Sequence, residues 1–318
     1  MRSLISVCFL LFFSGLPVRA QSLLPSEVPI QSSFRALSVI DDKVAWVGGS
    51  QGWVGKSLDG GATWQFEQVA GFEKSEFRSL YAFSSEVAVI ANAGSPATIL
   101  RTRDGGKTWN VVFTLNHPDA FFDGMDFWND TEGIIYGDPI AQRMVLLTTH
   151  DGGKTWEELP EAHRPTLHEG EASFAASGTG IRCFGKTSLM ISTGGKVSRL
   201  FATDDFGKKW TIHSPPILQG ESSTGIFSFA FSKAEGIVVG GDYTRDTLAT
   251  QHVLLTTDGG KTWTAPNTPT RGYRECVEYL SRTRVIAVGP KGIDLSNNGG
   301  ADWSPFSDET GYHVVRKA

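Results

Sequence analysis

A motif of eight residues that ends in tryptophan occurs six times in this chain of 318 residues. Its pattern is Ser/Thr-x-Asp-x-Gly-x-x-Trp, and Asn298 replaces the aspartate in the last copy. Successive tryptophans of the motif lie 45, 47, 54, 53 and 40 residues apart. Self-similarity at such a period indicates a repeat array, and all-β repeats of similar length usually form propeller blades. The copies span residues 57–64, 102–109, 149–156, 203–210, 256–263 and 296–303.

Each repeat also contains the pattern of four short antiparallel strands separated by turns. A first strand follows an opening aromatic residue, a second ends in glycine, a third leads into the motif and a fourth follows its tryptophan. Four such strands make one blade, so the pattern predicts an all-β propeller. We expect first strands at 33–37, 76–80, 122–125, 173–175, 227–229 and 273–276, and examples of the other three at 45–49, 146–149 and 110–113.

The motif itself has the composition of a tight turn. Its hydroxyl and carboxylate side chains can bond the backbone of a hairpin, and its glycine tolerates the positive φ of such a turn. The tryptophan can then cover the junction with a large apolar face. We therefore interpret the motif residues as structural rather than catalytic: Asp59, Asp104, Asp151, Asp205, Asp258 and Asn298, with Trp64, Trp109, Trp156, Trp210, Trp263 and Trp303.

The number of blades depends on how the last residues of the chain are interpreted. Residues 311–315 look like the first strand of a seventh repeat, and residues 21–32 could supply its outer strand. We therefore predict a seven-bladed propeller with an incomplete C-terminal blade, formed by residues 21–318 as a single domain. The alternative is a six-bladed ring with a terminal strand laid across the seam.

Residues 1–20 have the pattern of a secretory signal peptide, with an apolar stretch from 4 to 13 and small residues before Gln21. We expect an exported monomer, periplasmic or extracellular. Cleavage would remove Arg2 and Arg19 and no acid, which takes the net charge from −5 to −7. An acidic exported chain gives no reason to expect nucleic acid as a partner. No later stretch is long and apolar enough to span a membrane.

The sequence gives little support to a metal or a cofactor. Cys183 and Cys276 fall in the fourth and sixth repeats, which are not neighbours, so we expect neither a disulfide nor a zinc site. His163, His168 and Glu169 lie close together, but on a proline-flanked loop rather than at helical spacing. No βα unit with a Rossmann glycine fingerprint occurs, so we expect no nucleotide cofactor.

The motif is the Asp box, or bacterial neuraminidase repeat. Its fuller form, from Ala45 to Trp64, resembles the photosystem II stability/assembly factor-like propellers, which have many secreted bacterial relatives. Segments 137–140, 170–178 and 272–276 look like a bacterial subgroup often labelled as oxidoreductases or glycosyl hydrolases. The resemblance implies a propeller fold and, as in the assembly factors, an arginine-lined surface that holds a protein subunit. The Asp box also occurs in sialidases and sortilin, so it indicates fold more than function.

Blade geometry places the candidate site. All Asp boxes should share one face, and the long polar connections should share the other, where the residue after each opening aromatic should lie at the channel mouth. Those residues are Arg35, Arg78, Asp123, Ala175, Ser228, Arg274 and His313. Arginine forks bind carboxylate or phosphate in bidentate geometry, so we predict a ligand-binding ring. Its members are Arg35, Arg78, Asp123, Glu171, Arg274 and His313.

Three functional hypotheses remain open. The first is a non-catalytic scaffold that grips a peptide or protein through the arginine-bearing face. In the second, the arginines pair with neighbouring acids, such as Asp126, Glu171 and Glu275, and merely line a solvated pore. The third is a sialidase-like hydrolase, with Arg35, Arg78 and Arg274 gripping a glycan, Asp123 as acid, and Glu171 or Glu221 as helper. The sialidase Arg-Ile-Pro signature is absent, since Ala36 and Leu37 follow Arg35. We therefore expect no catalytic residue.

Overall fold

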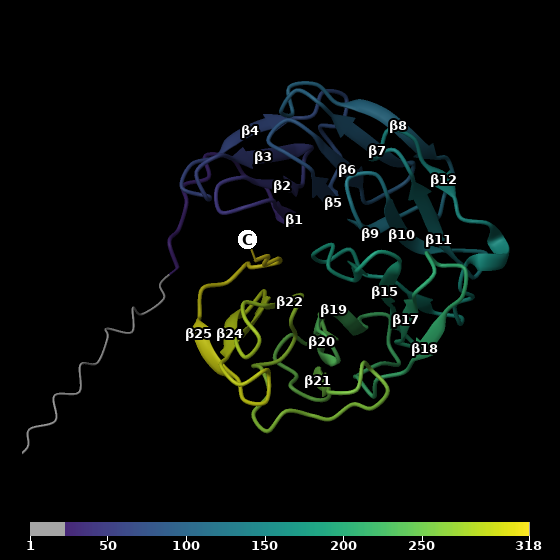
Figure 1. Ribbon diagram of the computed structural model, residues 1–318. Helices are drawn as coiled ribbons and strands as arrows, with labels where there is room; N and C mark the ends of the chain where they lie inside the picture. Colours follow the sequence, from purple (N-terminus) through teal and green to yellow (C-terminus); the bar gives the residue numbers. More distant parts are fainter. Residues whose placement is uncertain (1–22, 318) are drawn as a thin grey trace, which may run out of the picture.

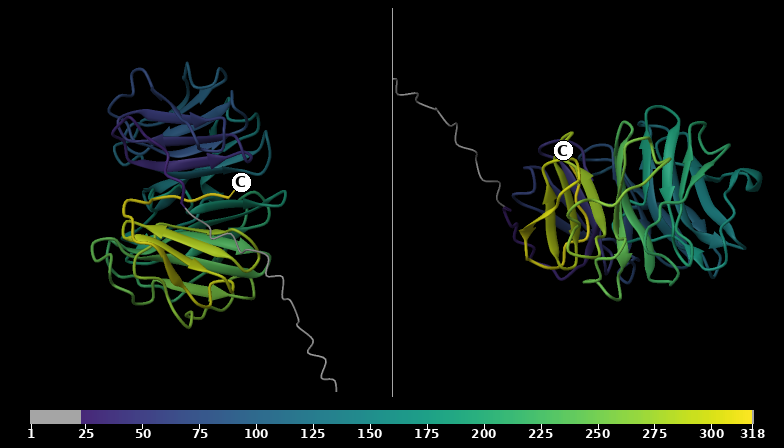
Figure 2. Two further views of the ribbon diagram at one scale, coloured as in Figure 1. Left: turned by 90° about the vertical axis from the view of Figure 1, so that its left-hand side faces the viewer. Right: turned by 90° about the horizontal axis from the view of Figure 1, so that it is seen from below.

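The repeats fold into blades arranged around a central axis. In the computed structural model, which describes residues 23–317, six sheets form a ring (Figure 1). Side views show that the blades form a single layer around the axis (Figure 2). The predicted signal peptide, residues 1–20, lies outside the described residues. Within them, the helical part is the short 3₁₀ turn η1 (Glu161–His163), and no helix has the length and apolar character needed to cross a membrane.

The strands follow one another outward from the axis in each blade. The bounds of blades 1 to 3 are as follows: β1 (Phe34–Val39), β2 (Ala45–Gly49), β3 (Trp53–Ser57) and β4 (Gln65–Gln68); β5 (Phe77–Ala82), β6 (Ala88–Asn92), β7 (Ala97–Thr102) and β8 (Asn110–Leu115); β9 (Phe122–Phe127), β10 (Gly133–Ile140), β11 (Arg143–Thr149) and β12 (Glu157–Glu158). All neighbouring strands in these blades are antiparallel.

Blades 4 to 6 follow the same plan with one modification. Their bounds are β14 (Ile181–Phe184), β15 (Ser188–Ser192), β17 (Leu200–Thr203) and β18 (Thr211–His213); β19 (Thr224–Ser232), β20 (Glu235–Asp242) and β21 (Val253–Thr256); β22 (Cys276–Tyr279), β23 (Val285–Gly289), β24 (Gly292–Ser296) and β25 (Ser304–Ser307). In blade 5 the fourth strand is reduced to a bridge between Leu255 and Thr264. Two short strands, β13 (Glu171–Ala172) and β16 (Gly194–Gly195), extend its inner edge.

The core lies between the blades, where neighbouring sheets pack face to face. The middle strands β6 and β23 are buried along their whole length. Trp46, Phe77 and Ile90 pack together between blades 1 and 2. Comparable apolar clusters separate each following pair of blades as far as blade 6. Burial on both faces explains why the strands are near-continuous apolar runs rather than strictly alternating.

The Asp-box turns repeat one pattern of hydrogen bonds. In the first copy, Ser57 Oγ donates to Asp59 Oδ1 (2.9 Å) and accepts the Gly61 amide (2.8 Å). Asp59 Oδ1 also accepts the amide of Thr63 (2.9 Å). The corresponding three bonds occur in all six copies, including the last, where Asn298 replaces the aspartate. Each turn therefore satisfies its Ser/Thr hydroxyl and its Asp or Asn side-chain oxygen locally.

The seven-bladed prediction is wrong, since the described residues form six blades and no seventh. Residues 23–33 and 308–317 form no strand. The C-terminal segment instead packs the side chains of Tyr312, Val314 and Val315 against blade 6, in the seam between that blade and β1 (Figure 1). A blade needs ladder hydrogen bonds, whereas the backbone of Val315 contacts only the Cys276 thiol at 3.4 Å. The six-bladed alternative describes the ring.

Two predicted first strands are also displaced. β22 begins only at Cys276, so residues 273–275 precede the strand, and in blade 4 the inner strand begins at Ile181 rather than near residue 173. Residues 173–180 instead cross the mouth of the channel. Ala176 accepts a hydrogen bond from Arg35 of blade 1, and Ser177 Oγ donates to the Glu275 carbonyl beside blade 6. Small side chains allow this crossing: a Cβ on Gly180 would lie 2.2 Å from the Tyr136 hydroxyl oxygen.

Candidate ligand-binding site

A cavity of about 510 Å³ opens at the axis of the ring. It is lined by the beginnings of inner strands and the ends of second strands, which places it on the face opposite the Asp-box turns. Segment 173–180, defined above, supplies part of its lining through residues 173–176. This volume is within the range of small-molecule and peptide pockets. The cavity lies where blade geometry predicted a site.

Two of the predicted arginines reach the cavity from neighbouring blades. Arg35 of β1 donates from Nη1 to Glu275 (2.9 Å) and to the Ala176 carbonyl (3.2 Å). Arg78 of β5 donates from Nε to Glu76 (2.7 Å). Their side chains are 24% and 29% exposed, respectively. The carboxylates thus orient both guanidinium groups, as the pairing hypothesis expected in part, while leaving both accessible to a ligand.

The opposite charge comes from blade 3. Asp123 of β9 and Asp138 of β10 both line the cavity. Asp123 is fully buried, and neither of its carboxylate oxygens has a hydrogen-bond partner among the described residues. Burial, and secondarily the charge of Asp138, raises the pKa of Asp123 well above its usual value, which Arg78 opposes in part. Burial also raises the pKa of Asp138, whose Oδ1 accepts the Ser173 amide at 2.9 Å.

An aromatic wall joins the two charged regions. Phe174 and Phe227 stack with their ring centroids 3.8 Å apart and their planes within 6°. Tyr243 is 52% exposed and stands edge-on to both rings. Tyr273 meets Phe227 edge-on at 4.7 Å. The cavity therefore combines guanidinium donors, carboxyl groups and accessible aromatic surface, which suits a ligand with both polar and apolar parts.

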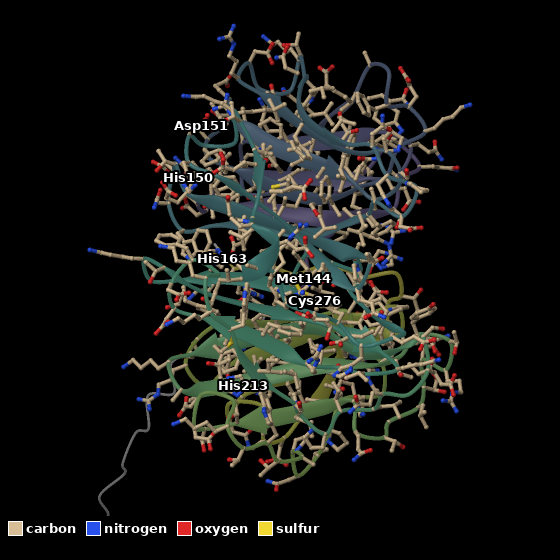
Figure 3. All side chains as sticks on the ribbon, turned by 90° about the vertical axis from the view of Figure 1, so that its right-hand side faces the viewer. Met144, His150, Asp151, His163, His213 and Cys276 are labelled. Carbon is tan, nitrogen blue, oxygen red and sulfur yellow. The ribbon has the colours of Figure 1, made fainter. Side chains whose placement is uncertain are left out.

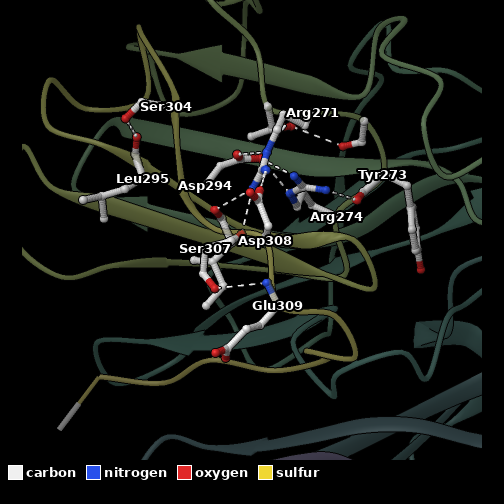
Figure 4. A network of polar contacts seen from close by, with 12 residues as sticks. Arg271, Tyr273, Arg274, Asp294, Leu295, Ser304, Ser307, Asp308 and Glu309 are labelled. Carbon is white, nitrogen blue, oxygen red and sulfur yellow. Dashed lines mark hydrogen bonds and ion pairs between the residues drawn. The ribbon is translucent and has the colours of Figure 1, made fainter. Parts of the chain in front are cut away.

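Arg274 does not reach the cavity, contrary to its place in the predicted ring. Its side chain is fully buried and donates from Nε to Asp294 at 2.9 Å and from Nη1 to the Tyr273 carbonyl at 2.7 Å. Asp294 also accepts Arg271 Nε at 2.7 Å, so one carboxylate joins two arginines in blade 6 (Figure 4). A buried carboxylate needs such pairing, and Arg274 satisfies it here.

Glu171 is likewise withdrawn from the cavity. It is buried, and its carboxylate accepts Arg199 Nε at 2.9 Å and Nη2 at 2.6 Å, together with the Thr193 hydroxyl at 2.6 Å. This pair ties the inner edge of blade 5 to blade 4. The three arginines and the carboxylate helper of the sialidase-like hypothesis are therefore not assembled in one place.

The remaining predicted positions have distinct surroundings. His313 lines the cavity, and its Nδ1 lies 2.7 Å from the same Glu275 oxygen that accepts Arg35. Glu275 therefore joins blade 1, blade 6 and the C-terminal segment across the seam. Ala175 contributes only its small side chain to the lining. Ser228 is buried and bonds Thr179 Oγ1 (2.7 Å) and the Val277 amide (3.1 Å), so it connects segment 173–180 to blades 5 and 6.

Sequence reasoning missed Asp138 and the aromatic wall. Asp138 follows Gly137, which pairs with Phe122 directly before Asp123, so the end of a second strand was the available signal.

Elsewhere, His150, His163 and His213 lie at separate positions along the outer side of the ring (Figure 3). The described residues contain no group of three or more side chains able to hold a metal ion. Cys183 and Cys276 are both free thiols.

These features define a six-bladed propeller whose candidate site is an axial cavity on the face opposite its repeated turns. The sequence profile of one family, described as photosynthesis system II assembly factor YCF48, matches residues 19–117 and 92–166. The chain is thus a propeller similar to the photosystem II assembly factors. No curated protein sequence matches it.

Solved structures show the same fold at low sequence identity. YCF48 bound to D1 peptide has a TM-score of 0.61 at 17% identity, over 88% of this chain and 84% of that one. YCF48 from Cyanidioschyzon merolae has a TM-score of 0.63 at 16% identity, over 91% and 90%. The GH74 enzyme of Niastella koreensis has a TM-score of 0.62 at 14% identity, over 85% of this chain but 46% of that enzyme. At such identities the likeness establishes fold alone.

Proposed function

We propose that this protein is an exported, non-catalytic scaffold that binds a peptide or protein segment in its axial cavity. One observation carries the proposal: two accessible arginines and an aromatic wall line the same cavity of about 510 Å³. Arginine forks can hold a carboxylate or a peptide carbonyl, and exposed aromatic rings can hold apolar side chains. The signal-peptide pattern of residues 1–20 supports the export part of the proposal.

The comparisons support the class of ligand. A YCF48 propeller of the same fold is known with D1 peptide bound, so this architecture can hold a peptide. The family similarity covers residues 19–166, which include β1, β5 and β9, the strands that position Arg35, Arg78 and Asp123. The partner of this chain need not be a photosystem subunit, because the arginines, carboxyl groups and aromatic rings of the cavity recognise chemical groups that many peptides contain.

A glycan-active hydrolase is the second candidate, and one observation favours it. Asp123 and Asp138 both line the cavity with raised pKa values, as a general acid would require. Glycosidase carboxyls, however, flank the scissile bond, whereas these two project from adjacent strands of one blade. Fluorogenic glycosides would test it: turnover by the protein that is lost in Asp123→Asn would support a hydrolase.

The test of the scaffold is a comparative pull-down from the envelope fraction of the source organism. Wild type is compared with Arg35→Ala/Arg78→Ala and with a control, Arg103→Ala/Arg282→Ala. The control removes two exposed arginines from turns on the Asp-box face, so the charge change is matched. We expect wild type and control to capture the same partner, and the cavity variant to lose it.

Folding of the variants is checked by thermal melting, since Arg35 also bridges the seam. Arg78→Ala alone, which breaks contacts only with Glu76 and Ala175, serves if the double variant melts early. Equal capture by wild type and a folded cavity variant would contradict the proposal, as would the absence of any specifically captured protein.

A further inference from the structure

Asp123 is a cavity group whose chemistry the arginine-centred function leaves unused. It lies at the beginning of β9, is fully buried and lines the cavity, yet both carboxylate oxygens lack a hydrogen-bond partner among the described residues. Buried carboxylates are normally paired or hydrogen-bonded, because an isolated one is costly to keep out of water. An unpartnered buried carboxyl at a cavity wall therefore points to a ligand group.

The neighbours of Asp123 do not supply a positive partner. Asp138 lies on the adjacent strand of the same wall and has one oxygen bonded to the Ser173 amide. The Tyr136 hydroxyl is buried close to Asp123 and also lacks a partner within residues 23–317. Arg78 faces them from blade 2, but its guanidinium is held by Glu76 and reaches the Ala175 carbonyl at 3.5 Å. Within residues 23–317, this part of the wall thus offers several acceptor atoms, and no lysine or arginine side chain is hydrogen-bonded to them.

The aromatic wall adds a second feature that suits a cation. The stacked pair Phe174 and Phe227, with Tyr243 edge-on to both, lines the same cavity as the carboxyl groups. Ring faces carry partial negative charge and attract ammonium groups. Arg35 and Arg78 are in the same cavity, so a ligand there can present an amine to one region and a carboxylate to the other.

We infer that Asp123 and Asp138 form a subsite for a protonated amine of the bound peptide, either a lysine side chain or a free α-amino group. The inference rests on the proposed function and names the chemistry of its ligand. An ammonium has three donors, enough to bond a carboxyl oxygen of Asp123 and the free oxygen of Asp138. The preferred peptide then contains an amine and, within a few residues, a carboxylate for the arginines.

The subsite also couples binding to proton release. Burial, and secondarily the charge of Asp138, raises the pKa of Asp123, and an ammonium group bound beside it would lower that pKa. The groups facing it are Asp138 and Tyr136 from β10 and Arg78 from β5. Arg35, Glu275 and His313 also line the cavity. Binding of an amine should therefore release protons, which binding of an uncharged analogue should not.

The experiment is isothermal titration of the mature chain with three tripeptides that end in a free carboxylate. Acetyl-Lys-Phe-Ala carries a lysine amine, Ala-Phe-Ala carries a free α-amine, and acetyl-norleucine-Phe-Ala carries neither. We expect one or both amine peptides to bind about tenfold more tightly than the norleucine peptide, since charge-assisted hydrogen bonds are worth that much. Titrations in phosphate and Tris buffers should show the proton release.

Matched variants distinguish this subsite from a general effect. Asp123→Asn should reduce the amine preference to less than about twofold and abolish proton release, with the norleucine peptide unaffected. Asp126→Asn is the control: Asp126 lies on the same strand, is half-buried and also has a raised pKa, but its carboxylate accepts the amides of Phe127 and Cys183 and does not line the cavity. It should behave like wild type.

The outcomes separate the inference from the function on which it depends. Equal affinity for all three peptides, lost in Arg35→Ala/Arg78→Ala, would overturn the amine subsite and leave the scaffold intact. An amine preference that survives Asp123→Asn would also overturn the subsite. Failure of all three peptides to bind at about 1 mM would count against both proposals.

Discussion

The two faces of the propeller treat aspartate in opposite ways. On the Asp-box face, Asp104 accepts the Thr102 hydroxyl, the Thr108 amide and the Thr108 hydroxyl within 2.9 Å. These bonds lower its pKa to about 2. On the cavity face, Asp123 has no such partner, and burial raises its pKa. The ionised form of aspartate is thus stabilised in the turns and destabilised at the axis.

The two faces also differ in how far their residues repeat from blade to blade. The turns use the same three hydrogen bonds in every blade, because the bonds form within eight residues and depend on no neighbour. The cavity positions differ from blade to blade, with Arg35 in blade 1, Arg78 in blade 2 and Asp123 in blade 3. Residues that repeat in every blade therefore indicate a structural role, and positions that differ between blades indicate the candidate site.

The largest expected effect concerns stability on the Asp-box face. Trp156 is 7% exposed and packs edge-on against Phe127 at 5.9 Å within the core between blades 2 and 3. Trp156→Ala should lower the free energy of unfolding by about 3–5 kcal/mol, because it leaves a large cavity. Phe174→Ala, in the partly exposed cavity wall, should cost less than half as much. Urea denaturation measures both, and equal losses would break the comparison of the two faces.

A smaller effect is expected for the buried hydroxyl of the turn. Thr149 is 1% exposed, and its Oγ1 donates to Asp151 (2.9 Å) and accepts the Gly153 amide (2.9 Å). Thr149→Val keeps the shape but leaves that amide unpaired, which should cost about 1–3 kcal/mol. Thr155→Val removes an exposed hydroxyl bonded to the same aspartate and should cost less than about 1 kcal/mol. If thermal melting ranks them equally, the local hydrogen-bond account of the turn is incorrect.

The contrast explains what could be predicted from sequence. The propeller fold and the position of the site follow from short-range patterns: the Asp box, the alternation of strands and the residue after each opening aromatic. Arg35, Arg78, Asp123 and His313 line the cavity as that pattern suggested. The place of each of these residues follows from its position in its own strand or segment and from the arrangement of the repeats around the axis.

Long-range pairing could not be predicted in the same way. Arg274 is withdrawn by Asp294, 20 residues later, and Glu171 by Arg199, 28 residues later, and no spacing rule reveals either partner. The crossing of the channel by segment 173–180 depends on bonds to blades 1, 5 and 6. The blade count was wrong for the same reason, because the C-terminal residues Tyr312, Val314 and Val315 pack their side chains against blade 6 instead of forming a strand of a seventh blade.

The pH dependence of stability tests the contrast most directly. For Asp123, the folded pKa lies above the unfolded value of 3.8, so its protonated form stabilises the fold and that contribution is lost as pH rises above about 4. Asp123→Asn cannot ionise, so its stability relative to wild type should increase with pH, by on the order of 1 kcal/mol between pH 4 and pH 6.

Asp104→Asn is the counterpart from the other face and should show the opposite trend. The folded pKa of Asp104, about 2, lies below the unfolded value of 3.8, so its ionised form stabilises the turn at neutral pH and the contribution is lost as pH falls from about 4 to 2. The stability of Asp104→Asn relative to wild type should therefore be lowest near pH 6 and should rise again toward pH 2. Urea titrations across this range measure both differences. Slopes of the same sign for the two variants would mean that the faces do not treat their carboxylates differently.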